Sequence, residues 1–97
     1  MKNVLIIEDN QDVRENMAEL LELENYKVNT AEDGEKGVEM ARLLKPDIII
    51  CDIMMPKLNG YDVLLRLRED KTTASIPFVF LTAKTERIDV RKGMNLG

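Results

Sequence analysis

Three short apolar runs occur along the chain, at residues 4–7, 48–51 and 78–81, and none of them alternates between apolar and polar positions. Uninterrupted apolar runs of this length are typical of strands that are covered on both faces, as in parallel sheets. A fourth segment, residues 26–31, is more polar and suits the edge of a sheet. The pattern therefore predicts four strands, one of them at an edge.

Helical patterns separate these strands. Met17, Leu20 and Leu21 lie four, seven and eight positions after Val13, which predicts one apolar face of a helix that Asn10 caps. A second helix is predicted from an Asp33 cap to Pro46.

A third helix is predicted around residues 63–67, and a fourth after the last strand, capped by Thr85. The order is thus strand, helix, four times over. Connections too long for hairpins join parallel strands by right-handed crossovers. We therefore expect an open α/β sheet with helices on both of its faces.

The composition limits the function. The 97 residues are 44% apolar and 33% charged, as in one small globular domain, and they include no His. The lack of His excludes Ser-His triads and His-ligated zinc within the chain. A net charge of −4 argues against direct nucleic-acid binding, so any DNA contact would belong to another module.

The location is predicted from the cysteine and the N-terminal residues. Cys51 is the single cysteine and lies within an apolar run, which favours a packing role in a reducing compartment. The apolar run at residues 4–7 is too short for a signal peptide or a membrane span. We expect a cytoplasmic domain with no membrane partner.

Acidic residues stand where predicted strands end. Glu8 and Asp9 follow the first strand, Asp52 follows the third, and Thr82 follows the fourth. Each acid alone could simply start a loop, but parallel strands bring all of them to one edge of the sheet. Carboxylates this close repel one another unless a cation lies between them, and oxygen ligands suit Mg²⁺. The sequence therefore predicts a Mg²⁺ site, followed by a loop in which Gly60 permits a backbone turn.

The same residues resemble a known family over the whole chain. The segments at residues 4–10, 45–56, 59–60 and 80–84 closely resemble the motifs of the receiver domain of bacterial two-component response regulators, with the family's spacing. The resemblance implies a flavodoxin-like open parallel sheet with strand order 2-1-3-4-5. It also implies a regulatory domain in a phosphorelay rather than a turnover enzyme.

The resemblance assigns roles residue by residue. Asp52 resembles the phosphoacceptor, which takes a phosphoryl group from a His of a sensor histidine kinase. Asp9 and Asp52 would bind Mg²⁺ directly, the Met54 carbonyl would be a further ligand, and Glu8 would act through water. Thr82 resembles the switch hydroxyl. Because Met54 is apolar and cannot orient a water, we expect slow self-dephosphorylation in a full-length parent.

Backbone N–H groups contact the phosphoryl oxygens in this family. The resemblance assigns this role to Ala83 and to Met54.

The chain departs from the family pattern at its C-terminal end. The family continues with a fifth strand, which carries an invariant Lys, and a fifth helix, so residues 1–97 match a (βα)4 fragment of a (βα)5 fold. Without that Lys we expect little phosphorylation of these residues alone. An uncovered strand at residues 78–81 would favour self-association or exchange of elements, and an output domain would follow the missing unit.

Two other functions remain open. One is a scaffold that folds and assembles without being phosphorylated. The other is a Mg²⁺-dependent phosphatase with an aspartyl nucleophile. Such phosphatases place a second Asp two positions after the nucleophile, where this chain has Met54, so the sequence disfavours the phosphatase.

Overall fold

The computed structural model describes residues 1–81. Its elements are β1 (Asn3–Ile7), α1 (Gln11–Leu23), β2 (Lys27–Ala31), α2 (Gly34–Leu44), β3 (Ile48–Asp52), α3 (Gly60–Glu69) and β4 (Phe78–Leu81). The alternation of strand and helix is therefore confirmed up to β4. The predicted fourth helix, together with Thr82 and Ala83, lies outside the described residues.

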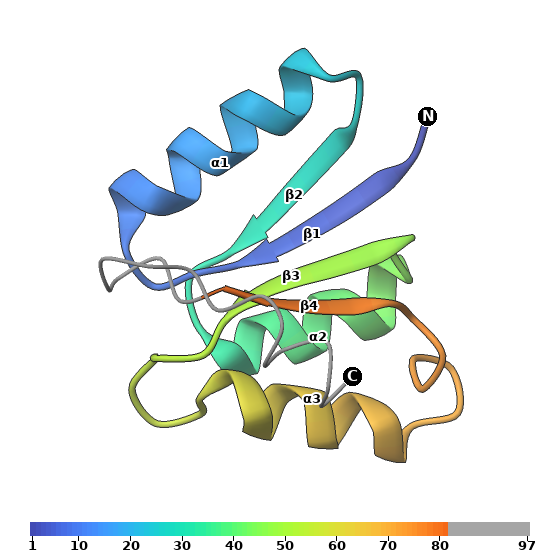
Figure 1. Ribbon diagram of the computed structural model, residues 1–97. Helices are drawn as coiled ribbons and strands as arrows, with labels where there is room; N and C mark the ends of the chain where they lie inside the picture. Colours follow the sequence, from blue (N-terminus) through green and yellow to red (C-terminus); the bar gives the residue numbers. More distant parts are fainter. Residues whose placement is uncertain (82–97) are drawn as a thin grey trace.

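The strands form one parallel sheet in the order β2-β1-β3-β4 (Figure 1). This order confirms the flavodoxin-like arrangement for the four strands. The polar strand β2 lies at an edge, as its composition predicted. β1 and β3 are the central strands, so their carboxyl ends are neighbours at one edge of the sheet.

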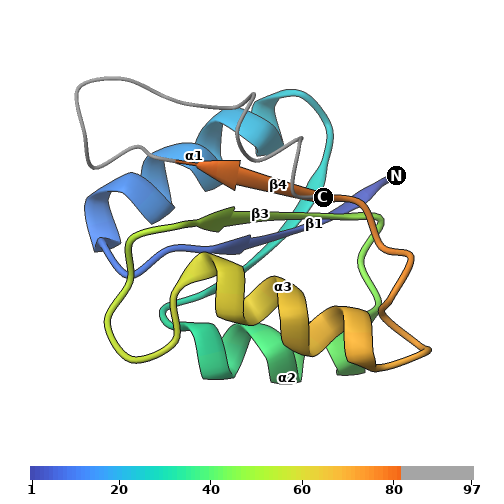
Figure 2. The same cartoon turned by 60° about the horizontal axis from the view of Figure 1, so that its bottom comes forward.

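Helices cover the two faces of the sheet unequally. α1 lies on one face, while α2 and α3 lie side by side on the other (Figures 1 and 2). The main core lies between the sheet and these two helices, which contribute buried Val38, Ala41, Val63 and Leu67. Among residues 1–81, none of the helices combines the length and the apolar content of a membrane span.

Side-chain caps begin all three described helices, and two of them, Asn10 and Asp33, are at the predicted positions. The side chain of Asn10 accepts a hydrogen bond from the Val13 N–H at the start of α1. The side chain of Asp33 accepts from the Lys36 N–H at the start of α2. Asn59 caps α3 with a complete capping box. These caps satisfy backbone donors that the first turn of a helix leaves unpaired. The Asn10 and Asp33 caps lie within three residues of the ends of β1 and β2, so these two strand-to-helix connections are short.

The prediction for Leu20 is wrong. Leu20 is 63% exposed, although the periodicity predicts it on the apolar face of α1. The half-buried residues of this helix include Arg14, Met17, Ala18 and Leu21. These half-buried residues form one face of α1, and the centre of that face lies roughly 90° around the helix axis from Leu20. The helix is rotated toward Arg14, a charged residue that a purely apolar pattern leaves out.

Candidate functional site

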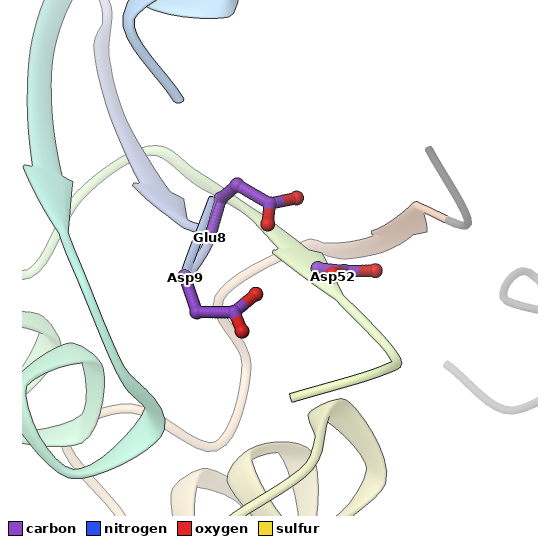
Figure 3. A group of neighbouring side chains, drawn as sticks. All are labelled: Glu8, Asp9 and Asp52. Atoms are coloured by element: carbon purple, nitrogen blue, oxygen red, sulfur yellow. The ribbon is translucent and has the colours of Figure 1, made fainter. Parts of the chain in front are cut away.

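The predicted acidic residues meet at the carboxyl edge of the central strands. Ile7 of β1 pairs with Cys51 of β3, so the next residues, Glu8 and Asp52, continue this register. Glu8, Asp9 and Asp52 each offer a carboxylate oxygen within 4.8 Å of the others. Figure 3 shows the side chains of Glu8 and Asp9 extending toward the side on which Asp52 lies. The fold therefore brings together acids that are more than forty positions apart in the sequence.

Burial and hydrogen bonds fix these carboxylates. Glu8 and Asp52 are fully buried, and Asp9 is half-buried. The Asn10 N–H donates to Glu8 Oε2 at 2.9 Å, and the Met54 N–H donates to Asp52 Oδ1 at 3.3 Å. Two of the three acids are thus removed from water while a backbone donor orients each of them. Such a site is preorganised for a cationic ligand.

The neighbouring thiol experiences the charge of this cluster. Cys51 is fully buried between the acidic edge and the core, and it has no disulfide partner among the described residues. Burial raises the pKa of the Cys51 thiol well above its ordinary value, and the negative charges of Asp52 and Glu8 raise it further. A thiol in this environment stays protonated and unreactive, so Cys51 has the packing role that the sequence predicted.

The spacing of the acids suits a small divalent cation. Oxygen ligands on one Mg²⁺ ion lie about 3 to 4 Å apart, because the metal–oxygen distance is about 2.1 Å. Carboxylate oxygens within 4.8 Å of one another therefore fit a shared ion with small adjustments, or with one acid bound through water. Carboxylate and carbonyl oxygens are the donors that Mg²⁺ prefers. The residues present fit the ion that the sequence implies.

In the loop after β3, Met54 contacts the site through its backbone. The Met54 N–H donates to Asp52 Oδ1, whereas the Met54 side chain is 59% exposed. The loop closes where the Gly60 N–H donates to the Ile53 carbonyl at 3.0 Å.

The predicted role of Gly60 needs correction. No described glycine has a positive φ, and in this loop Lys57 has one, at 67°. A Cβ on Gly60 would lie 2.6 Å from the Asp52 carbonyl oxygen. Gly60 is therefore required for close packing against the acid-bearing strand, rather than for a turn that only glycine adopts.

Sequence reasoning missed one contact at this edge. Arg14 of α1 donates from Nη1 to the backbone carbonyl of Glu8 at 2.9 Å. A basic residue on a helix usually reads as a solvated surface charge, so the sequence pattern does not predict this contact. The unusual position of an Arg in the first turns of a helix, where the macrodipole disfavours a positive charge, was the available signal.

Comparisons with known proteins agree on one family. The family model described as the response regulator receiver domain matches residues 4–97. The DNA-binding dual master transcriptional regulator RpaA of Synechocystis is 40% identical over 97 residues, which are 100% of this chain and 40% of that protein. The chain thus spans about 40% of the length of the curated relatives it matches.

Solved structures show the same fold. The chemotaxis protein CheY4 of Vibrio cholerae has a TM-score of 0.85 and 28% identity, and the match covers 100% of this chain and 81% of that one. The receiver domain of the sensor histidine kinase PA1611 of Pseudomonas aeruginosa has a TM-score of 0.83 and 26% identity, with 99% and 79% covered. That structure contains a magnesium ion coordinated in its active-site cleft.

Proposed function

The chain belongs to the response regulator receiver family, and from this premise we propose that it is a phosphoacceptor switch whose reacting group is Asp52. Receiver domains of response regulators are regulatory domains of two-component signalling. The proposed donor is the phosphohistidine of a sensor histidine kinase, which supplies the His that this chain lacks. The observation that carries the proposal is the cluster of Glu8, Asp9 and Asp52 within 4.8 Å.

In the proposed site Asp9 and Asp52 hold Mg²⁺ directly, the Met54 carbonyl is a further ligand, and Glu8 acts through a bound water. The burial of Glu8 and Asp52 supports this arrangement, because buried carboxylates close to one another are costly without a cation. When bound, Mg²⁺ would offset negative charge on the acids and on the phosphoryl oxygens.

The residues of the chain then have simple tasks. A carboxylate oxygen of Asp52 attacks phosphorus, and the new O–P bond forms as the P–N bond to the kinase imidazole breaks and its electron pair stays on nitrogen. Transfer of this kind needs positioning and charge stabilisation more than covalent help. The Met54 N–H is already directed at Asp52. We assign the switch hydroxyl to Thr82 and another backbone donor to Ala83, both outside the described residues.

The partners follow from the same chemistry. A sensor kinase phosphorylates the domain in the cytoplasm, and the phosphorylated form changes its contacts with an output domain or a partner protein. RpaA is described as DNA-binding. In the present protein we assign any such activity to a separate output module, because the receiver residues carry a net charge of −4.

The switch is favoured over a phosphatase by the residue at Met54. An aspartyl phosphatase needs a general acid or base close to its nucleophile. The thioether of Met54 cannot transfer a proton, and the side chain is 59% exposed.

Phosphorylation is tested by incubating the protein with a small acyl phosphate and Mg²⁺, followed by mass spectrometry of its peptides. The phosphoryl label is expected on Asp52. It should form only when Mg²⁺ is present, and it should be absent from Asp52→Asn. Asp47→Asn is the matched control, since Asp47 is an exposed acid just before β3, at the opposite end of the strand. A label that persists in Asp52→Asn contradicts the proposal. Only a small fraction of the protein is expected to be labelled, and Mg²⁺ binding with no detectable label would favour the scaffold function.

A further inference from the structure

The first turns of α1 contact Glu8 at two different points. The backbone N–H of Asn10 donates to the Glu8 carboxylate, at Oε2, over 2.9 Å. The guanidinium of Arg14 donates to the Glu8 backbone carbonyl, also over 2.9 Å. On its other side, the Glu8 N–H donates to the Ala31 carbonyl of β2 at 3.1 Å. Glu8 is therefore held between the helix and the edge strand.

Asn10 also caps the helix. Its side-chain Oδ1 accepts from the Val13 N–H at 3.0 Å, and its carbonyl accepts from the Arg14 N–H at 2.9 Å. These bonds fix the backbone of Asn10 and thereby the direction of the N–H that orients Glu8. The cap of α1 and the orientation of an acid in the site depend on one residue.

The position of Arg14 supports a role at the site. A positive charge near the N-terminus of a helix opposes the macrodipole, and Arg14 is a half-buried residue. The hydrogen bond to the Glu8 carbonyl offsets part of this cost. This bond ties the second turn of α1 to the end of β1, directly before Asp9.

We propose that Asn10 and Arg14 are positioning residues, which couple the order of the first turn of α1 to cation binding at Glu8, Asp9 and Asp52. The inference rests on the proposed Mg²⁺ site. An ordered first turn holds the acids in place before the ion binds. The free-energy cost of fixing the acids on binding is then smaller, and the affinity for Mg²⁺ is higher. The coupling must be reciprocal: bound Mg²⁺ should also stabilise the first turn.

The test uses Asn10→Ala, which removes the cap without changing the net charge. A lost Asn cap costs about 1 kcal/mol, so Mg²⁺ binding measured by calorimetry is expected to weaken about fivefold. Thr73→Val is the matched control. It removes the hydrogen bond from the buried Thr73 hydroxyl to the Leu67 carbonyl, 2.7 Å long and at the C-terminal end of α3, and also preserves charge. This control should lose similar stability and keep the wild-type affinity for Mg²⁺.

Amide hydrogen exchange of the wild-type protein gives the reciprocal measurement. Exchange at the Val13 and Arg14 N–H groups is expected to slow severalfold when Mg²⁺ is added, because both groups bond to Asn10. This measurement also decides the case if Asn10→Ala does not fold.

The outcomes separate the inference from the proposed function. If the wild-type protein binds no Mg²⁺, both are wrong. If it binds Mg²⁺ but Asn10→Ala and Thr73→Val have equal affinities, the coupling is wrong and the metal site stands. Unchanged exchange at Val13 and Arg14 on addition of Mg²⁺ overturns the coupling in the same way.

Discussion

Asp52→Asn is expected to raise the free energy of unfolding of the metal-free protein and, at the same time, to remove most of its stabilisation by Mg²⁺. Asp52 is fully buried, and its carboxylate lies within 4.8 Å of Glu8 and Asp9. At an effective dielectric constant near 20, the repulsion between two unit charges 4.8 Å apart is worth about 3.5 kcal/mol. Asn has nearly the same shape and can still accept the Met54 N–H, so the substitution relieves repulsion without opening a cavity.

Urea unfolding with and without Mg²⁺ measures both effects. At ten times its dissociation constant, a ligand that binds only the folded state stabilises it by about 1.4 kcal/mol. Wild type should show this gain and Asp52→Asn should show almost none. The difference between their free energies of unfolding should therefore shrink or reverse as Mg²⁺ is added. The exposed-site control Asp47→Asn should keep the gain. A metal-free Asp52→Asn protein that is less stable than wild type would falsify the electrostatic account of the cluster.

Gly60→Ala is expected to destabilise the protein by about 2 to 3 kcal/mol, the cost of forcing an added methyl group into a packed site. A Cβ at this position would lie 2.6 Å from the Asp52 carbonyl oxygen and 2.9 Å from the Ile53 Cα. Both are backbone atoms, so neither can move without shifting the end of β3. Mg²⁺ affinity should fall as well, because this shift displaces the Asp52 carboxylate.

The sign of the stability change in Gly60→Ala shows whether tight packing or helix propensity dominates at this position. Gly60 is the first residue of α3 and has no positive φ, so propensity alone predicts that Ala stabilises the helix by up to about 1 kcal/mol. Thermal or urea unfolding distinguishes the two. Leu65→Ala, at a position on the same helix that is 63% exposed, should change stability by less than about 0.5 kcal/mol. A Gly60→Ala protein as stable as wild type contradicts the packing argument.

The sheet and the acidic cluster could be predicted because the relevant signals are local. β1 and β3 are the central strands of a parallel sheet, and each is encoded as an unbroken apolar run. An acid placed directly after such a run must lie at the carboxyl edge of a parallel sheet. That rule was enough to bring Asp9 and Asp52 together.

The remaining features depend on contacts that no local pattern encodes. The rotation of α1 that exposes Leu20 follows from where the helix packs, and the half-buried Arg14 is part of that packing. The need for glycine at position 60 arises from the approach of α3 to the Asp52 carbonyl. Both are tertiary effects, which override helical periodicity and turn preference.

The central claim is that acids from two separate strands together hold one divalent cation. Calorimetric titration of Mg²⁺ into the wild-type protein and into Asp9→Asn tests it most directly, since Asp9 follows β1 whereas Asp52 ends β3. We expect one ion per wild-type chain and an affinity at least about tenfold lower for Asp9→Asn, as for the loss of a charged ligand. No binding to the wild-type protein, or equal affinity in the two proteins, would contradict the account.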